Sequence, residues 1–157
     1  MDDRIKEINS ALTQLYKSED ELYHRYGVCC SLSDPAVWVL YGLFEDSART
    51  ITQNDLVSTW FYPKQTINYT VAALVKNGWV ELKQLPVARN SKAVILTEEG
   101  ERVCKERILP LMRAEETALK RMTDEEREQL FALTKKKFAY FEEEIAKITG
   151  DMKKESK

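Results

Sequence analysis

Apolar residues recur at intervals of three and four near both ends of the chain. The first stripe, between Asp2 and about Tyr26, consists of Ile5, Ile8, Leu12, Leu15, Leu22 and Tyr26. The last consists of Phe131, Phe138, Phe141, Ile145 and Ile148. This spacing predicts two amphipathic helices. Gly27 is expected to end the first helix in a left-handed conformation, and Thr123 with Glu126 predicts a capping box for the last.

Between these stripes the pattern predicts three further helices in succession. Ser33-Asp34-Pro35 predicts the start of a helix whose body, residues 36–46, is apolar almost all round and therefore buried. Thr52, with Asp55 three residues later, predicts a capped helix that ends near Phe61. The next helix is expected from Pro63 to Asn77, with Gly78 ending it.

The helix expected at residues 63–77 has two distinct faces. Its inner face is predicted to contain Ile67, Val71, Leu74 and Val75. Its outer face is predicted to contain Lys64, Gln65, Asn68, Tyr69 and Ala72. Short polar side chains with only one charge are what a helix that lies against base edges requires.

Two short strands, residues 79–82 and 93–96, flank a ten-residue connection and predict a hairpin. Thr97 is expected to cap a following helix that Pro110 should kink. The polar residues 151–157 are expected to fray. The fold class is therefore mainly α with a small β-hairpin wing. A winged helix-turn-helix at residues 33–97 would bind DNA, and residues 1–32 and 98–150 would form a helical dimerisation region.

Composition and charge are compatible with this interpretation. With 43% hydrophobic and 32% charged residues, the 157-residue chain is expected to be globular, and it contains no apolar run long enough to span a membrane. Residues 52–97 contain five basic and two acidic side chains, a net charge of +3, which leaves −5 for the rest of a chain with a net charge of −2. Local positive charge is what neutralises phosphates.

The outer helices have apolar stripes that a small DNA-binding unit cannot cover. Pairing them with those of a second copy would bury both stripes, so a homodimer is the favoured interpretation. The stripes would alternatively close a single monomeric bundle.

Two segments resemble the MarR family of bacterial transcriptional regulators. They are Gln65-Thr66-Ile67-Asn68 leading into residues 74–80, which read Leu-Val-Lys-Asn-Gly-Trp-Val, and residues 91–100, which read Ser-Lys-Ala-Val-Ile-Leu-Thr-Glu-Glu-Gly. The order of the expected helices also matches, and the resemblance covers nearly the whole chain. It implies a homodimer that binds double-stranded DNA, with one helix of each copy in the major groove.

The resemblance also implies which residues contact DNA. Gln65, Thr66, Asn68 and Tyr69 would face bases, Lys64 would contact phosphate, and Arg89, Asn90 and Lys92 would lie at or near the tip of the wing. The family's wing usually has an Asp-x-Arg, but here the corresponding residues are Ala88-Arg89-Asn90. The acidic residue that would hold the arginine is absent, so ordering Arg89 on DNA costs more entropy.

Two further sets of residues are candidate sites. Tyr16, Tyr23, Trp38, Tyr41 and Phe44 would either line a pocket for a small aromatic effector, as the resemblance implies, or pack in the core. Cys29, Cys30 and Cys104 would either sense oxidants through a thiolate, with His24 and Arg25 as the neighbouring cations, or be inert. His24, Cys29 and Cys30 do not make a zinc ligand set with recognisable spacing, so no metal or cofactor is expected.

No catalytic motif is present, so an enzyme is not expected. The N-terminus does not resemble a signal peptide, and a cytoplasmic protein is expected. The leading hypothesis is a homodimeric, sequence-specific transcriptional regulator that binds a pseudo-palindromic operator. The resemblance to the family implies that this regulator is a repressor. The alternatives are a winged-helix module that binds a protein rather than DNA, and a regulator that senses oxidants through its thiols.

Overall fold

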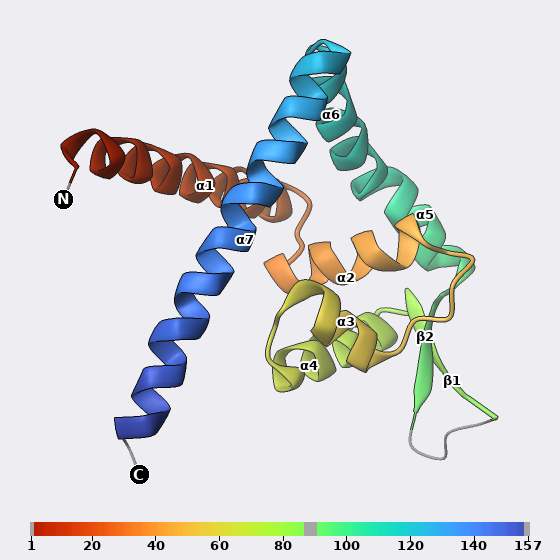
Figure 1. The fold of residues 1–157 in the computed structure, drawn as a ribbon. Coiled ribbons are helices and arrows are strands. Elements are labelled where there is room, and N and C mark those ends of the chain that lie inside the picture. The colour runs from red at the N-terminus through yellow and green to blue at the C-terminus, as the bar shows by residue number, and fades with distance from the viewer. Residues whose placement is uncertain (1, 87–90, 156–157) are drawn as a thin grey trace. The chain divides into compact units, whose positions relative to one another are not determined.

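The computed structural model describes residues 2–86 and 91–155. The chain divides into two units, Met1–Leu111 and Met112–Lys157. The first contains α1 (Asp3–Cys29), α2 (Asp34–Glu45), α3 (Gln53–Trp60), α4 (Lys64–Lys76), β1 (Val80–Gln84), β2 (Lys92–Leu96) and α5 (Glu98–Arg107). α6 (Leu109–Lys120) begins in the first unit and ends in the second, which also contains α7 (Asp124–Glu155). The predicted fold class, mainly helical with one hairpin, is confirmed (Figure 1).

The core of the first unit forms around α2, which is apolar on nearly every face. Its N-terminus is capped by Ser33, whose hydroxyl accepts a hydrogen bond from the backbone N–H of Ala36. Val39 and Leu40 are fully buried, and α2 packs against α1, α3, α4 and α5. The prediction that this helix is buried is therefore confirmed.

The predicted end of α1 at Gly27 is wrong. The helix continues to Cys29, and Ser31 adopts the left-handed conformation instead, with φ of 56°. Gly27 is buried within the helix, where an added Cβ would lie 3.1 Å from the carbonyl oxygen of Leu32 and 3.2 Å from a methyl group of Val37. This glycine therefore allows the start of α2 to pack closely against α1, a contact that a local end signal does not reveal.

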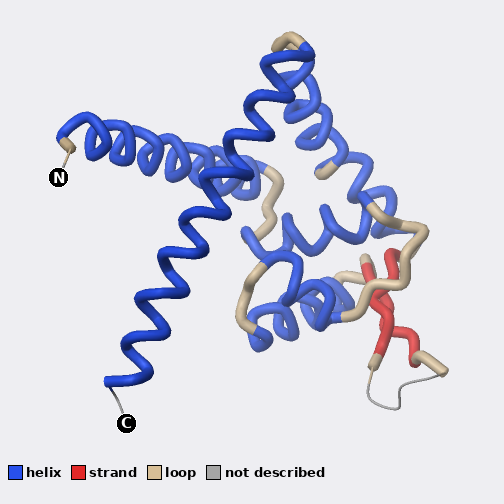
Figure 2. Tube along the Cα trace, viewed as in Figure 1, coloured by secondary structure: helices blue, strands red, loops and turns tan. Residues whose placement is uncertain are grey.

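The two strands form an antiparallel hairpin with Val80 opposite Leu96 and Gln84 opposite Lys92. The strands are confined to this hairpin in the described part of the chain (Figure 2). The segment before α3 pairs with β2, because the backbone N–H of Val94 donates to the carbonyl oxygen of Ile51 at 2.8 Å. This pairing was not predicted, and it joins the base of the hairpin to the start of α3.

The helices after the hairpin follow the predicted caps but not all of the predicted boundaries. Pro110 does more than kink one helix: α5 ends at Arg107 and α6 begins at Leu109, because proline removes a backbone donor and its ring clashes with the preceding turn. The capping box of α7 is confirmed, since the backbone N–H of Thr123 donates to the Glu126 carboxylate at 2.8 Å. α7 continues through Gly150 to Glu155 rather than ending at residue 150.

Gly100 should be intolerant of any side chain. A Cβ added to it would lie 1.8 Å from the carbonyl oxygen of Trp79, which is backbone and cannot turn aside. Replacing Gly100 with alanine is expected to lower the free energy of unfolding by about 1–3 kcal/mol. Urea unfolding at one fixed protein concentration measures this change.

Gly150→Ala is the matched control for Gly100→Ala. Gly150 lies in a helix and has no atom within 4 Å of the added Cβ. Its replacement should leave stability unchanged or raise it by up to about 1 kcal/mol through helix propensity. Equal urea midpoints for the two variants would contradict the contact with Trp79.

Candidate nucleic-acid interface

α4 has one buried face and one face open to solvent. Ile67 and Val71 are fully buried, and α4 packs against α2 and α3. On the opposite side Lys64, Gln65, Asn68 and Tyr69 are exposed, with Tyr69 at 79%. Thr66 is half-buried. The structure therefore places four of the five candidate side chains of α4 fully outward and the fifth at the boundary.

The predicted inner face of α4 contained one error. Val75 is 39% exposed, and Thr70 is buried in its place. Thr70 tolerates burial because its hydroxyl donates a hydrogen bond at 2.8 Å to the backbone carbonyl of Thr66. Hydrophobicity alone favoured Val75 for the inner face. The geometry of the helix places Thr70 there instead, because it lies three residues after Ile67 and four before Leu74.

The N-terminus of α4 has no capping side chain. Pro63 occupies the cap position, and the first turn contains no acidic residue. The first backbone N–H groups of a helix have no partner within the helix, and the helix dipole places partial positive charge there. With Lys64 as its first residue, this end of α4 is suited to an anion.

A groove of about 250 Å³ lies between the start of α3, α4 and the hairpin. It contains three of the predicted DNA contacts, Lys64, Asn68 and Lys92, although Lys92 is distant from the other two in the sequence. Its remaining lining residues are Thr52, Gln53, Asn54, Leu82 and Ser91. Gln53, Asn54 and Ser91 were not predicted as site residues. Gln53 and Asn54 lie within the helix start that Thr52 and Asp55 predict, and nothing local in the sequence indicates that the hairpin lies near them.

The start of α3 is held by a complete capping box. The Asp55 carboxylate accepts hydrogen bonds from the backbone N–H and the hydroxyl of Thr52, each at 2.8 Å, and the N–H of Asp55 donates to the Thr52 hydroxyl at 3.2 Å. These hydrogen bonds lower the pKa of Asp55. The carboxylate therefore stays ionised, and the groove-lining residues 52–54 are fixed on a rigid helix start.

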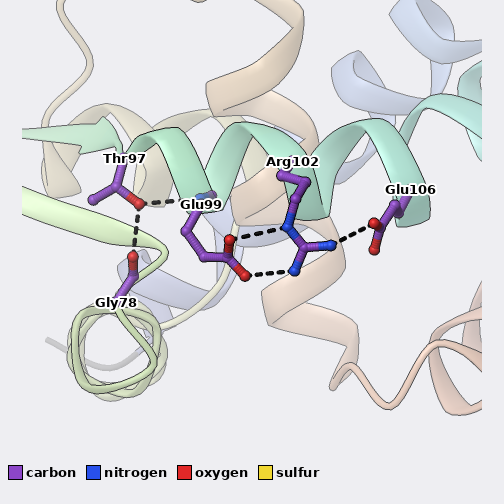
Figure 3. Close-up of polar contacts among 6 residues, drawn as sticks. Gly78, Thr97, Glu99, Arg102 and Glu106 are labelled. Atoms are coloured by element: carbon purple, nitrogen blue, oxygen red, sulfur yellow. Dashed lines mark hydrogen bonds and ion pairs between the residues drawn. The ribbon is translucent and has the colours of Figure 1, made fainter.

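A second threonine positions the base of the hairpin. The Thr97 hydroxyl donates to the carbonyl oxygen of Gly78 at 2.6 Å and accepts from the N–H of Gly100 at 3.0 Å (Figure 3). Gly78 has φ of 74°, which glycine adopts without strain. Thr97 thereby connects the turn after α4 to the start of α5.

Arg102 holds the exposed side of α5 in one arrangement. Its guanidinium donates two hydrogen bonds to the Glu99 carboxylate and one to Glu106, as Figure 3 shows. The hydrogen bonds from Arg102 lower the pKa of Glu99. Because these side chains are solvent-exposed, the network contributes little to the stability of the fold.

Two of the predicted wing residues, Arg89 and Asn90, lie outside the described residues. Lys92 is exposed at the start of β2, opposite Gln84. The predicted contacts of Arg89 and Asn90 with DNA therefore remain predictions.

Three of the five aromatic candidates form a contact cluster with a fourth ring that was not predicted. Trp38 packs against Tyr23, Tyr41 and Trp60, with ring centroids 4.8, 5.5 and 4.9 Å apart. The indole nitrogen of Trp60 is buried without a hydrogen-bond partner, and a Cβ on Gly42 would lie 2.9 Å from it. The packing of the Trp60 ring against α2 depends on the absence of a side chain at Gly42. The sequence pattern did not predict this role for Gly42.

The other two aromatic candidates differ in burial. Tyr16 lies on α1 and is 42% exposed, and Phe44 is half-buried on α2. A small-molecule site at the predicted aromatic set therefore remains a prediction.

Arg107 connects three elements of the first unit. Its guanidinium donates to the carbonyl oxygen of Cys30 at 3.1 Å and lies 5.4 Å from the centre of the Trp79 ring. The hydroxyl of Tyr26 donates to the carbonyl oxygen of Arg107 at 3.0 Å. Burial raises the pKa of Tyr26 to about 12, so this hydroxyl remains a donor. The end of α1, the end of α5 and the residue before β1 are therefore joined by one side chain.

The three cysteines lie in different environments. Cys29 is exposed, Cys30 is half-buried, and Cys104 is buried with its Sγ 3.9 Å from the carbonyl oxygen of Leu40. Burial raises the pKa of Cys104 to about 12, which disfavours the reactive thiolate. Within the described residues, no three His, Cys, Asp or Glu side chains lie close enough together to hold a metal ion.

The two cations expected near Cys29 and Cys30 have other partners. His24 Nδ1 lies 2.9 Å from the Asp34 carboxylate, and Arg25 lies 3.9 Å from Glu21. The cation that does reach this region, Arg107, is 77 residues away from Cys30 in the sequence. Spacing along the chain could not reveal it.

Among residues 2–86 and 91–155, no single helix has both the length and the apolar composition to cross a membrane. α1 and α2 together meet these criteria only as a pair bent by 89°.

A helix-turn-helix whose second helix exposes a polar face, followed by a two-stranded hairpin, defines a winged helix-turn-helix protein. A family model described as the MarR family matches residues 32–89. An uncharacterised HTH-type transcriptional regulator of Bacillus subtilis, YwoH, is 31% identical over 128 residues, which cover 79% of this chain and 85% of YwoH. The chain belongs to the MarR family of transcriptional regulators.

Solved structures of the family have the same fold. S. aureus MepR in its DNA-binding conformation matches with a TM-score of 0.73 at 17% identity, covering 85% of this chain and 98% of that chain. NMB1585, a MarR family regulator from Neisseria meningitidis, matches with a TM-score of 0.73 at 19% identity, covering 92% and 97%. The S. aureus MepR–DNA complex matches with a TM-score of 0.69 at 17% identity, covering 85% and 97%.

The single histidine of the chain provides a test of the contact between α1 and α2. The hydrogen bond and negative charge of Asp34 raise the pKa of His24 above its ordinary value of 6.5. The stabilisation of the folded protein by the His24–Asp34 ion pair is therefore complete below about pH 6.5. It is lost as the pH rises through the higher pKa that His24 has in the folded protein. An NMR titration should give a midpoint above 6.5, and Asp34→Asn should lower it. An unchanged midpoint in that variant would contradict the pairing.

Cys104 should react only when the protein unfolds. A pKa of about 12 leaves roughly one thiol in 10⁴ ionised at pH 8, and burial excludes the reagent as well. Titration with a thiol reagent, in buffer and then in denaturant, should show that Cys104→Ser removes one equivalent from the denaturant-dependent fraction only. Loss of an equivalent from the fraction that reacts in buffer would show that Cys104 is accessible.

Proposed function

We propose that the chain is a homodimeric repressor that recognises a pseudo-palindromic DNA operator. Residues 33–97 form the DNA-binding domain, and helices from residues 1–32 and 98–150 join two copies. The observation that carries this proposal is the outer face of α4, where exposed polar side chains lie opposite a fully buried apolar face. The S. aureus MepR–DNA complex, which has the same fold, supports DNA as the partner.

Asn68 and Gln65 are the proposed readers of sequence. Both are exposed on α4, and their side-chain amides can donate to and accept from an adenine edge in the major groove. Tyr69 is exposed enough to contact a base or the backbone. Thr66 is half-buried, so only part of its side chain is available to a thymine methyl group.

Phosphate contacts are proposed for the groove and the wing. Lys64 and Lys92 line the same groove from α4 and β2, beside Gln53 and Asn54 at the start of α3. Arg89 and Asn90, in the connection between the strands, would extend these contacts along the duplex. A segment charge of only +3 favours weak non-specific binding, so base contacts must supply most of the discrimination.

Two copies are required because one α4 reads only half of a pseudo-palindromic site. Ile5, Leu15 and Leu22 on α1 are exposed in a single chain, as is the apolar stripe of α7. Burying such residues against a second copy is the main driving force for association. The two α4 helices would then enter successive major grooves about 34 Å apart.

Regulation by a small aromatic effector is the remaining part of the proposal. Tyr23 lies on α1, the expected dimerisation helix, and it contacts Trp38, which with Tyr41 lies on α2 of the proposed DNA-binding domain. An effector that binds one arrangement of the dimer more tightly would shift the population away from the arrangement that fits DNA. The protein would act in the cytoplasm, where the bacterial chromosome lies.

Replacing Asn68 with alanine should weaken binding to the specific operator by about 1–3 kcal/mol and relax the preference at one base pair per half-site. Replacing Lys64 with alanine should weaken binding to all sequences alike. It should also reduce, by about 2, the magnitude of the slope of the logarithm of the binding constant against the logarithm of the salt concentration, because each of the two copies would lose one phosphate contact. An operator selected from a random pool, followed by binding titrations at several salt concentrations, measures both effects.

Asn77→Ala and Lys76→Ala are the matched controls, since both residues are exposed at the other end of α4. They should leave specificity unchanged. Failure to select any sequence from the pool would overturn DNA recognition and favour a winged-helix module that binds a protein. An equal loss on operator and random DNA for Asn68→Ala would show that Asn68 does not read sequence.

A further inference from the structure

The middle of α4 carries no charge. Lys64 and Lys76 are the first and last residues of the helix, and residues 65–75 between them contain no Lys, Arg, Asp or Glu. The charged side chains are the ones that read a G·C pair most specifically in the major groove. Arginine and lysine donate to guanine O6 and N7, and aspartate and glutamate accept from cytosine N4. The middle of α4 therefore lacks the charged readers of G·C.

The exposed side chains of this uncharged stretch are amides and apolar groups. Gln65 and Asn68 are exposed amides, Tyr69 is 79% exposed, and Ala72 is exposed three residues after it. Residues three, four and seven positions apart share one face of a helix, so these four side chains form a single stripe. The stripe lies on the side of α4 opposite the buried face that packs against α2 and α3.

The stripe is long enough to meet a short run of base pairs. From Gln65 to Ala72 the helix rises about 10 Å, at roughly 1.5 Å per residue. This is the height of about three base-pair steps of roughly 3.4 Å each. Lys64 precedes the stripe and lies in the groove that also contains Lys92. The charges are thus available to phosphates, whereas the stripe itself is available to bases.

We propose that the base pairs read by this stripe are A·T, with thymine methyl groups packed against Tyr69 and Ala72 and adenine edges hydrogen-bonded to Gln65 and Asn68. This inference rests on the DNA-binding regulator of the proposed function and adds the base composition of the part of each half-site that α4 reads. It gives Tyr69 and Ala72 a role in selecting sequence alongside the two amides.

Both kinds of side chain in the stripe favour A·T over G·C. The amide of asparagine or glutamine can donate to adenine N7 and accept from adenine N6 at the same time. The ring of Tyr69 and the methyl group of Ala72 displace water from the base edges without replacing its hydrogen bonds, which costs free energy. Only A·T pairs carry a methyl group in the major groove, so only they return apolar burial for the displaced water.

A preference for A·T can also arise from the width and stiffness of the duplex, without any contact to the bases. The two origins differ in what they require of thymine. Uracil in place of thymine removes the 5-methyl group and keeps the hydrogen bonds to adenine. The methyl group is therefore the atom on which the test depends.

The test begins with an operator selected from a random DNA pool by the full-length protein. Selections with Gln65→Ala, Asn68→Ala, Tyr69→Ala and Ala72→Gly then identify the base pairs at which each residue sets the preference. These pairs should be A·T in the wild-type selection. G·C pairs at them would overturn the inference and leave the sequence-specific regulator of the proposed function intact.

Deoxyuridine then replaces thymidine at the positions that Tyr69 sets. Wild-type binding should weaken about fourfold for each methyl group removed, as expected for the loss of one buried methyl. Tyr69→Ala should bind the thymine and uracil operators equally. Tyr69→Phe should keep the fourfold difference, because the ring rather than the hydroxyl packs on the methyl group.

Asn77→Ala is the matched control in the protein. Asn77 is exposed at the C-terminal end of α4, beyond the stripe, so this variant should keep the full difference between thymine and uracil. Deoxyuridine outside the mapped positions is the control in the DNA and should leave binding unchanged. Helical content by circular dichroism shows that each variant is folded.

The outcomes separate the base composition from the proposed function. Equal affinity of the wild type for the thymine and uracil operators would overturn the thymine contact and leave operator binding intact. A difference that persists in Tyr69→Ala would do the same. Failure to select any sequence from the pool would overturn both the inference and the proposed function.

Discussion

The packing of α4 against α2 determines which side of α4 is available to DNA. Ile67 and Val71 are fully buried, and any rotation of the helix that buried its polar face would expose them. Fully exposing one such side chain costs about 1.5–3 kcal/mol, so rotation costs more than most single base contacts supply. The positions of Asn68 and Gln65 therefore follow from an apolar interaction on the opposite side of the helix.

Local signals predicted the starts of helices well. Thr52, Thr97 and Thr123 each cap a helix as the sequence indicated, because a cap involves only the next three residues. The errors came from long-range contacts. Gly27 resembles a helix end, but it is needed inside α1 so that α2 can pack there. Pro110 indicated a kink, and the chain has two separate helices on either side of Ile108.

The candidate DNA-contacting face was predictable in part for the same reason. The outer side chains of α4 lie on one helix, so helical periodicity alone brings Lys64 and Asn68 together. The groove also contains Lys92 and Asn54, which meet only because Ile51 pairs with Val94 and brings the hairpin to the start of α3. Trp60 was missed similarly: its partner Trp38 lies on another helix, and Gly42 makes room for it.

The contacts of Arg107 have a mechanical consequence. The end of α1 is bonded to α5 in both directions, through the Cys30 carbonyl and the Tyr26 hydroxyl, while the same guanidinium lies over Trp79 at the entrance to β1. A displacement of the last turn of α1 must either break these hydrogen bonds or move Trp79, the residue before β1, with it. Strain that enters at the N-terminal helix thus has a direct route, through hydrogen bonds and one cation–π contact, to the strand that carries the wing.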